Sequence, residues 1–122
     1  MATEKDLMDA IARIESDVTG FIAASFVDLE SGMTLAAKSN RSDFDLSVAS
    51  AYNSEMVKQK LKIMKALNLR TSFEDMTITL GDQIHMIKLV GSGTFIYLAV
   101  DRAQSNLAIV RNVLQKNAAA FA

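Results

Sequence analysis

The sequence predicts an α+β fold in which a five-stranded antiparallel sheet carries helices on both faces. The longest helical pattern, residues 42–68, contains no Gly or Pro in its interior. Residues 21–28 and 94–101 are apolar on both alternating faces, which is typical of strands in the middle of a sheet. Residues 73–80, which alternate, and residues 83–90 flank Gly81-Asp82, the spacing of a hairpin. The predicted order is helix, two strands, long helix, three strands, helix.

Composition favours one globular domain, spanning 1–122 with a core at about 5–115. Half of the 122 residues are hydrophobic and 22% are charged. The net charge of −1, with both signs interspersed, argues against nucleic-acid binding. The absence of cysteine excludes disulfides and thiolate metal sites. No apolar run approaches the roughly 18 residues of a membrane span, and the N-terminus lacks a signal-peptide core. We therefore expect a cytoplasmic protein without membrane insertion.

The first helix is expected from Thr3 to about Ser16. Thr3 and Asp6 have the spacing of a capping box, in which each side chain bonds the other residue's backbone N–H. Its apolar stripe comprises Leu7, Ala10, Ile11 and Ile14.

A hairpin is expected to follow the first helix. The turn at 29–32 joins the strand at 21–28 to a second strand at 33–38, and Gly32 can take the positive φ that such a turn needs. A polar loop at 40–43 then leads into the long helix.

The long helix organises the rest of the chain. Ser42 is expected to cap it in a second capping box with Asp45, and Asn68 is a plausible left-handed stop. About 24 residues would give a rod of roughly 35 Å. The predicted core stripe consists of Leu46, Ala49, Val57, Leu61 and Met64. It is widened by Tyr52, Met56, Ile63 and Leu67 to about half the circumference, more than one sheet contact needs.

Two polar residues, Asn53 and Lys60, lie near the middle of this apolar arc. One interpretation is that Asn53 bonds locally and Lys60 extends its stem to reach water. The other is that the helix serves two contacts, its own sheet and a second chain. The opposite face is polar and carries Glu55, Lys58, Gln59, Lys62 and Lys65.

The last elements are expected to be a hairpin, a central strand and a helix. The strand at 73–80 alternates polar and apolar residues, as expected for a long edge strand, and pairs with 83–90. Asp101 and Gln104 are expected to open the final helix, and residues 118–122 to fray. The residues predicted to pack this helix on the sheet are Leu107, Val110 and Leu114.

Motifs for catalysis are lacking. The glycines are accounted for by turns, without a Walker A loop or a dinucleotide fingerprint. His85, the only histidine, is expected in mid-strand with Gln83 and Ile87 on its side and no nucleophile. Turn formation by Asp28 and capping by Asp45 explain the acidic residues better than a paired acid and base. These observations predict an interaction module, neither an enzyme nor a cofactor or metal protein.

Four segments carry a resemblance to a known family. Residues 27–36, 43–69, 80–90 and 95–111 resemble the bacterial branch of the roadblock/dynein light chain family. The resemblance spans about residues 5–115, and its motifs are structural. It implies a profilin-like α-β-α sandwich with sheet order 2-1-5-4-3.

The resemblance also implies a dimer. Family members pair through the third strand and the long helix into a ten-stranded sheet, here 73–80 and 44–67. A two-fold dimer uses the same patch on both subunits. The homodimer, or a pairing with another roadblock chain, would use Tyr52, Met56, Lys60, Ile63, Phe73, Asp75, Met76, Thr77 and Ile78.

A further implication concerns the partner. Family members scaffold or regulate Ras-like small GTPases on the paired long helices. The corresponding docking residues here would be Glu55, Lys58, Gln59, Lys62 and Lys65. No arginine finger can be named, so a GTPase-activating role would act by ordering the GTPase's own switch elements.

Two other functions stay open at this point. Profilin-like sandwiches also resemble small-molecule sensor domains, although the apolar filling of 21–27 and 94–100 argues against a pocket beneath the long helix. A self-assembling structural protein is the other alternative. An enzyme based on His85 is the least favoured.

Overall fold

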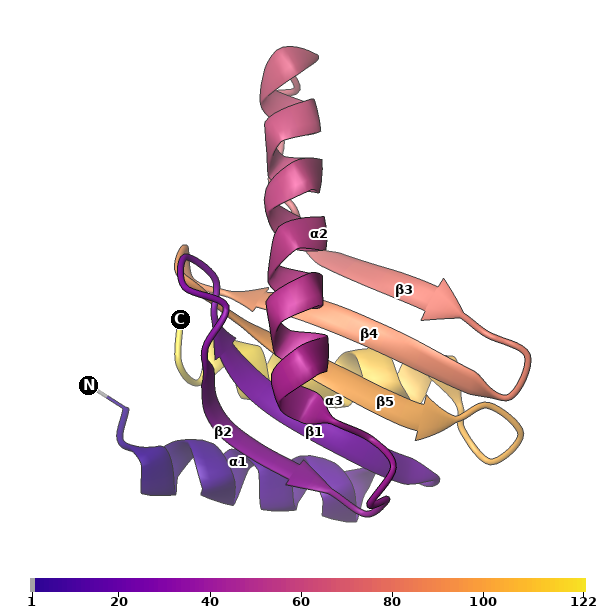
Figure 1. Cartoon of the computed structure of the whole chain (residues 1–122). Coiled ribbons are helices and arrows are strands. Elements are labelled where there is room, and N and C mark those ends of the chain that lie inside the picture. Colours follow the sequence, from indigo (N-terminus) through magenta and orange to yellow (C-terminus); the bar gives the residue numbers. More distant parts are fainter. Residues whose placement is uncertain (1) are drawn as a thin grey trace.

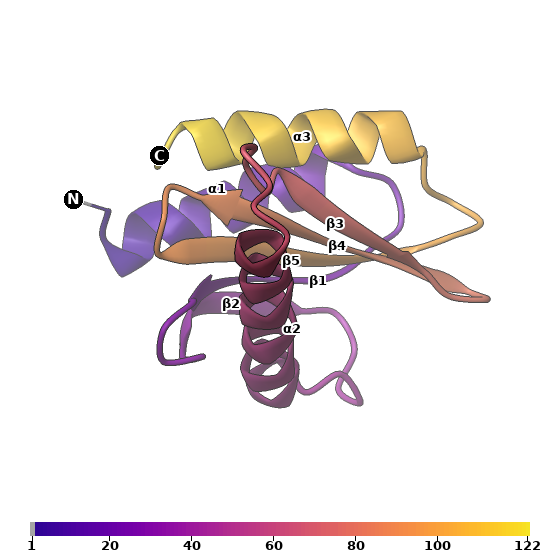
Figure 2. The same cartoon turned by 90° about the horizontal axis from the view of Figure 1, so that it is seen from above.

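A five-stranded antiparallel sheet of order β2-β1-β5-β4-β3 forms the middle layer of the computed structural model, which describes residues 2–122 (Figure 1). Helices α1 and α3 lie on one face and α2 crosses the other (Figure 2). This arrangement confirms the predicted fold class, element order and strand order. The elements are α1 (Glu4–Asp17), β1 (Phe21–Asp28), β2 (Thr34–Ser39), α2 (Leu46–Ala66), β3 (Asp75–Thr79), β4 (Gln83–Val90), β5 (Thr94–Asp101) and α3 (Leu107–Ala119).

The two predicted central strands lie in the middle of the sheet. Residues 22–27 of β1 and 95–100 of β5 are all buried, and Ser25 lies opposite Tyr97 in their antiparallel register. One core fills the space between the sheet and α1 with α3, and another lies beneath α2. Burial on both faces explains why these strands lack the polar alternation of a half-exposed sheet.

Helix α1 begins as its sequence predicts. The Thr3 Oγ1 accepts from the Asp6 N–H at 3.1 Å, and the Asp6 carboxylate accepts from the Thr3 N–H at 2.9 Å. The predicted apolar stripe is buried. No helix within residues 2–122 is long and apolar enough to cross a membrane.

Helix α2 begins later than predicted. The Asp45 carboxylate is the N-cap and accepts from the N–H groups of Ser47 and Val48 at 3.0 and 3.2 Å. The predicted capping by Ser42 is wrong, because the chain makes a turn ahead of the helix in which the Phe44 N–H bonds the Arg41 carbonyl. The predicted stop is confirmed, since Asn68 has a φ of 56°.

The buried face of α2 differs from the predicted core stripe. Leu46 and Val57 are buried as expected, whereas Ala49, Leu61 and Met64 are half-buried. The other buried residues are Ser50 and Ser54. Their small side chains allow the β1–β2 turn to approach, and the Ser50 hydroxyl lies 2.8 Å from the Thr34 hydroxyl. Gly32, with a φ of 75°, lies against the same turn of the helix.

Only the N-terminal half of α2 packs closely on the sheet. From residue 58 to the end of the helix no residue is buried, and Figure 1 shows this half standing clear of the strands. The predicted rod is therefore present, but its second half projects from the domain.

The edge strand β3 is shorter than predicted. It spans five residues, Asp75–Thr79, so the long edge expected over 73–80 is wrong. Phe73 and Glu74 belong to the connection between α2 and β3 and lie outside the ladder.

The C-terminal predictions also need correction. Asn106 caps α3 by accepting from the Ile109 N–H at 3.1 Å, whereas Asp101 accepts from Gln104 in a preceding turn. Leu107, expected on the sheet, is exposed. The predicted fraying is wrong, because α3 continues to Ala119 and Phe121 packs edge-on against Phe26 at 5.6 Å.

Candidate interaction surface

A row of exposed apolar side chains runs along α2, on a face separate from the buried one. We call it the outer stripe. Its spacing follows the helical repeat, so the side chains project in similar directions. Tyr52 is 74% exposed and Leu67 63%. The outer stripe comprises Val48, Tyr52, Met56, Ile63 and Leu67.

The edge of β3 is the second part of the candidate surface. β3 pairs with β4 on one side and has no partner strand on the other within residues 2–122. Its free N–H and C=O groups can accept another strand. Met76 and Ile78 are half-buried opposite Ile87 and His85 of β4, on the face covered by α2.

The other residues near β3 that the sequence predicts at the interface, Asp75, Thr77 and Phe73, do not lie together with Met76 and Ile78 on the α2 face of the strand. Asp75 forms an ion pair with Arg111 of α3 at 3.0 Å, which places it on the opposite side of the sheet. Thr77 is exposed. Phe73 is half-buried and, with Lys60 and Met64, lines a groove of about 290 Å³ between α2 and the chain entering β3.

The predicted docking face of α2 contains one lysine that is already bonded. Lys58 is half-buried, donates to the Glu30 carbonyl at 2.7 Å and lies 4.0 Å from the Glu55 carboxylate. This bond ties the helix to the β1–β2 turn, a role that α2's own sequence pattern could not reveal. The exposed members of the face are Glu55, Gln59, Lys62 and Lys65.

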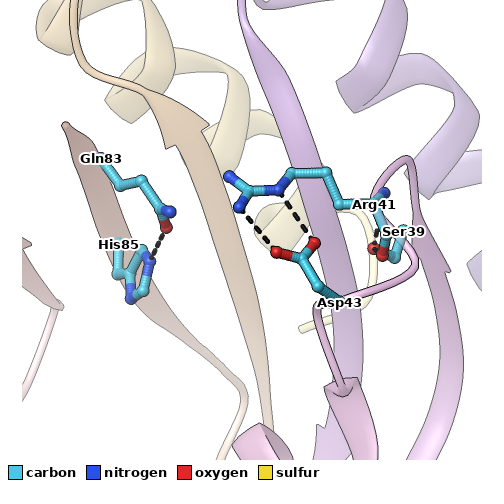
Figure 3. Close-up of polar contacts among 5 residues, drawn as sticks. All are labelled: Ser39, Arg41, Asp43, Gln83 and His85. Atoms are coloured by element: carbon cyan, nitrogen blue, oxygen red, sulfur yellow. Dashed lines mark hydrogen bonds and ion pairs between the residues drawn. The ribbon is translucent and has the colours of Figure 1, made fainter.

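His85 lies in a small aromatic cluster on the α2 side of the sheet. Its Nε2 is 2.7 Å from the Gln83 Oε1, as Figure 3 shows, and its Nδ1 is 3.0 Å from the Tyr97 hydroxyl. Phe44, just ahead of α2, meets the histidine ring edge-on at 5.9 Å and stacks on Tyr97. Gln83 was expected beside His85, whereas Tyr97 and Phe44 were not.

Burial favours the uncharged forms of His85 and Tyr97, as expected for side chains that pack in a core. Burial lowers the pKa of His85, and the nearby Asp82 carboxylate opposes that effect. Burial raises the pKa of Tyr97 to about 12. Gln83 and Tyr97 engage both ring nitrogens of His85, and the raised pKa of Tyr97 keeps its hydroxyl protonated near neutral pH. The cluster therefore fixes the start of α2 against β4 and β5.

Other charged groups near this cluster are engaged locally. Arg41 donates to both Asp43 oxygens at 3.2 and 3.0 Å in the loop ahead of α2 (Figure 3). This contact lowers the pKa of Asp43. Across residues 2–122, no three His, Cys, Asp or Glu side chains gather where they could hold a metal ion.

The order and pairing of these elements define the roadblock/LC7 fold, and comparison with solved structures agrees. MglB, the gliding protein of Thermus thermophilus, is similar with a TM-score of 0.83 and 15% identity, covering 99% of this chain and 89% of that chain. An MglB described with a tetrameric arrangement is similar with a TM-score of 0.86 and 16% identity. The match covers 99% of this chain and 88% of that chain. A roadblock/LC7 domain from Streptomyces avermitilis is similar with a TM-score of 0.79 and 12% identity. The match covers 89% of this chain and 88% of that chain.

These comparisons establish the fold. The resemblance noted in the sequence is confirmed at that level, and the chain has a roadblock fold like that of bacterial MglB. No protein-family model matches the chain, and no curated protein matches its sequence.

Proposed function

We propose that this chain is a non-enzymatic regulator that dimerises through α2 and β3 and binds a Ras-like small GTPase on the paired helices. The observation that carries the proposal is the outer stripe beside the open β3 edge. The outer stripe and the β3 edge lie near the second half of α2, which has no sheet beneath it.

A second copy is the occupant that fits this surface. Removing exposed apolar side chains from water is favourable by about 25 cal/mol per Å² of surface buried. A two-fold axis would bring stripe against stripe and β3 against β3, which satisfies both features at once. The proposed interface comprises Tyr52, Met56, Lys60, Ile63, Phe73, Asp75, Met76, Thr77 and Ile78.

The GTPase-binding part rests on the residues that such pairing would leave free. At 100° per residue, Lys65 lies about 160° around the helix from Ile63 of the outer stripe, and Lys62 lies about 100° from it. Exposed lysines steer an acidic partner and raise its association rate. The proposed contact set is Glu55, Lys58, Gln59, Lys62 and Lys65. Binding would act as a scaffold, or would activate GTP hydrolysis by ordering the GTPase's own switches.

A pull-down from the host's lysate tests this function. Tagged protein is used as bait with a non-hydrolysable GTP analogue and, separately, with GDP. We expect mass spectrometry to identify a Ras-like GTPase in at least one lane. Absence of a GTPase from both lanes, with a bait shown to be a folded dimer, would contradict the proposal and favour the sensor or self-assembly alternatives.

Charge reversal then tests the docking face. K62E/K65E should weaken GTPase affinity by at least about tenfold, because like charges would face each other across the contact. K5E/K116E changes the charge equally on α1 and α3 and should leave the affinity unaltered. Equal affinities for the two variants would remove the lysines from the contact.

A further inference from the structure

Basic residues are concentrated in one segment of the chain. Residues 56–73 contain five of the 13 Lys and Arg residues and none of the 14 Asp and Glu residues. The rest of the chain therefore has eight basic residues against 14 acidic ones. We call this segment's cationic part, residues 58–70, the basic tip. Its basic residues are Lys58, Lys60, Lys62, Lys65 and Arg70.

Most of these cations are unengaged. Lys58 bonds the Glu30 carbonyl, but Lys60, Lys62, Lys65 and Arg70 are exposed, and none takes part in an ion pair within residues 2–122. A favourable interaction with the helix dipole explains Lys65, which lies in the last turn. It does not explain the others, which lie earlier in the helix or beyond it.

The basic tip also carries exposed leucines and projects from the domain. Leu67 is 63% exposed and Leu69 48%, and Lys65 and Arg70 flank them in sequence. Figure 1 shows this end of α2 as the part that stands farthest from the sheet. Apolar side chains bordered by cations are typical of segments that lie in a membrane interface; here Leu69 and Arg70 belong to the chain that follows α2, which ends at Ala66.

We propose that the basic tip binds the surface of an anionic lipid membrane. Lys62, Lys65 and Arg70, which lie outside the proposed dimer interface, would contact acidic headgroups, and Leu69 would enter the headgroup layer. Clusters of four to eight basic residues have the chemistry for such surfaces. The proposal goes beyond GTPase binding and does not depend on it.

Charge and shape favour a membrane over an acidic protein at this place. The acidic remainder of the chain would be repelled by an anionic surface, so only a projecting element can make contact without that cost. The tip is convex and carries leucines among its cations. A bilayer matches this pattern because its acyl chains lie directly beneath its charged headgroups. Lys62 and Lys65 stay free when a second copy covers the outer stripe.

Vesicle sedimentation tests the proposal with the full chain. Vesicles of phosphatidylcholine alone are compared with an equimolar mixture with phosphatidylglycerol. We expect binding to the anionic vesicles only, weakened by added salt. Each basic residue near such a surface contributes about fivefold to partitioning, so K62Q/K65Q should bind about 25-fold more weakly. K5Q/K116Q, with the same charge change elsewhere, should bind like the wild type.

The leucine contribution has its own matched pair. Leu69→Ser should weaken partitioning by about tenfold, whereas Leu80→Ser, at a similarly exposed leucine beyond the far end of β3, should not. Equal binding to neutral vesicles, or unchanged binding of K62Q/K65Q, would overturn the proposal. So would a wild type that binds no vesicles while its GTPase affinity still depends on Lys62 and Lys65, a result that leaves the proposed function intact.

Discussion

Single residues at the start of α2 decide how the helix meets the sheet. Asp45 fixes the first turn by accepting backbone N–H groups, and Phe44 inserts its ring beside His85 and Tyr97. Bonds from Ser47 and Val48 lower the pKa of Asp45, as expected for a carboxylate that caps as an anion. Helix start and sheet are thus joined by a cap and an aromatic contact that lie next to each other.

The cap gives the first prediction. Asp45→Ala should lower the free energy of unfolding by about 1 kcal/mol, because two helix N–H groups lose their acceptor. Ser42→Ala should change it little, since Ser42 does not cap the helix. Urea denaturation at neutral pH measures both, and a larger loss for Ser42→Ala would restore the capping box expected from the sequence.

His85 gives a pH-dependent prediction. Its pKa is lower in the folded chain, so the unfolded chain binds the proton more readily. The stability contributed by the neutral ring is present above the ordinary pKa of about 6.5 and falls as the pH drops below it. The cap and turn carboxylates Asp6, Asp28 and Asp45 have lowered pKa values and titrate in more acidic solution.

The measurement is the urea midpoint at about pH 7 and about pH 5, on either side of the ordinary histidine pKa. The wild type should lose stability between the two values, and His85→Gln should lose less because its amide does not titrate. Parallel losses in both proteins would show that another group governs this pH range.

At the scale of elements, periodicity predicts the sheet better than the helix faces. β1 and β5 are recognisable because burial on both faces leaves a continuous apolar run. The buried face of α2 was partly missed because Ser50 and Ser54 are polar by type yet bury well, with Ser54 bonding the Ser50 carbonyl at 2.9 Å. The sequence pattern includes four outer-stripe residues in the wide apolar arc and omits Val48, because pattern alone does not show where the sheet ends. The four residues are Tyr52, Met56, Ile63 and Leu67.

The outer stripe gives a prediction about assembly. Ile63→Asp should convert the proposed dimer to a folded monomer, since a carboxylate buried in an apolar contact is strongly disfavoured. Ile109→Asp, at a comparably exposed position on α3, should remain a dimer. Analytical ultracentrifugation measures the mass of each variant, with circular dichroism as a check of folding. A dimeric Ile63→Asp variant would move the interface away from α2.

At the scale of the whole molecule, two regions stand out by what they lack within residues 2–122. The second half of α2 has no sheet beneath it, and the edge of β3 has no partner strand. The sequence indicated both, through the wide apolar arc and the half-polar strand. It could not show that β3 is short or that Phe121 packs on Phe26, since both depend on contacts distant in sequence.

Hydrogen exchange tests whether one partner covers both regions. If the wild type forms the proposed dimer, the amides of residues 58–66 and the outward amides of β3 should exchange slowly, because pairing excludes water and supplies acceptors. In Ile63→Asp the same amides should exchange faster, while those of α1 and β5 keep their wild-type rates. Because α2 and β3 would be covered by the same copy, their protection should be lost together. Loss in α2 alone would mean that the helices pair without joining the sheets, and protection confined to β2 would place the second copy at the opposite edge.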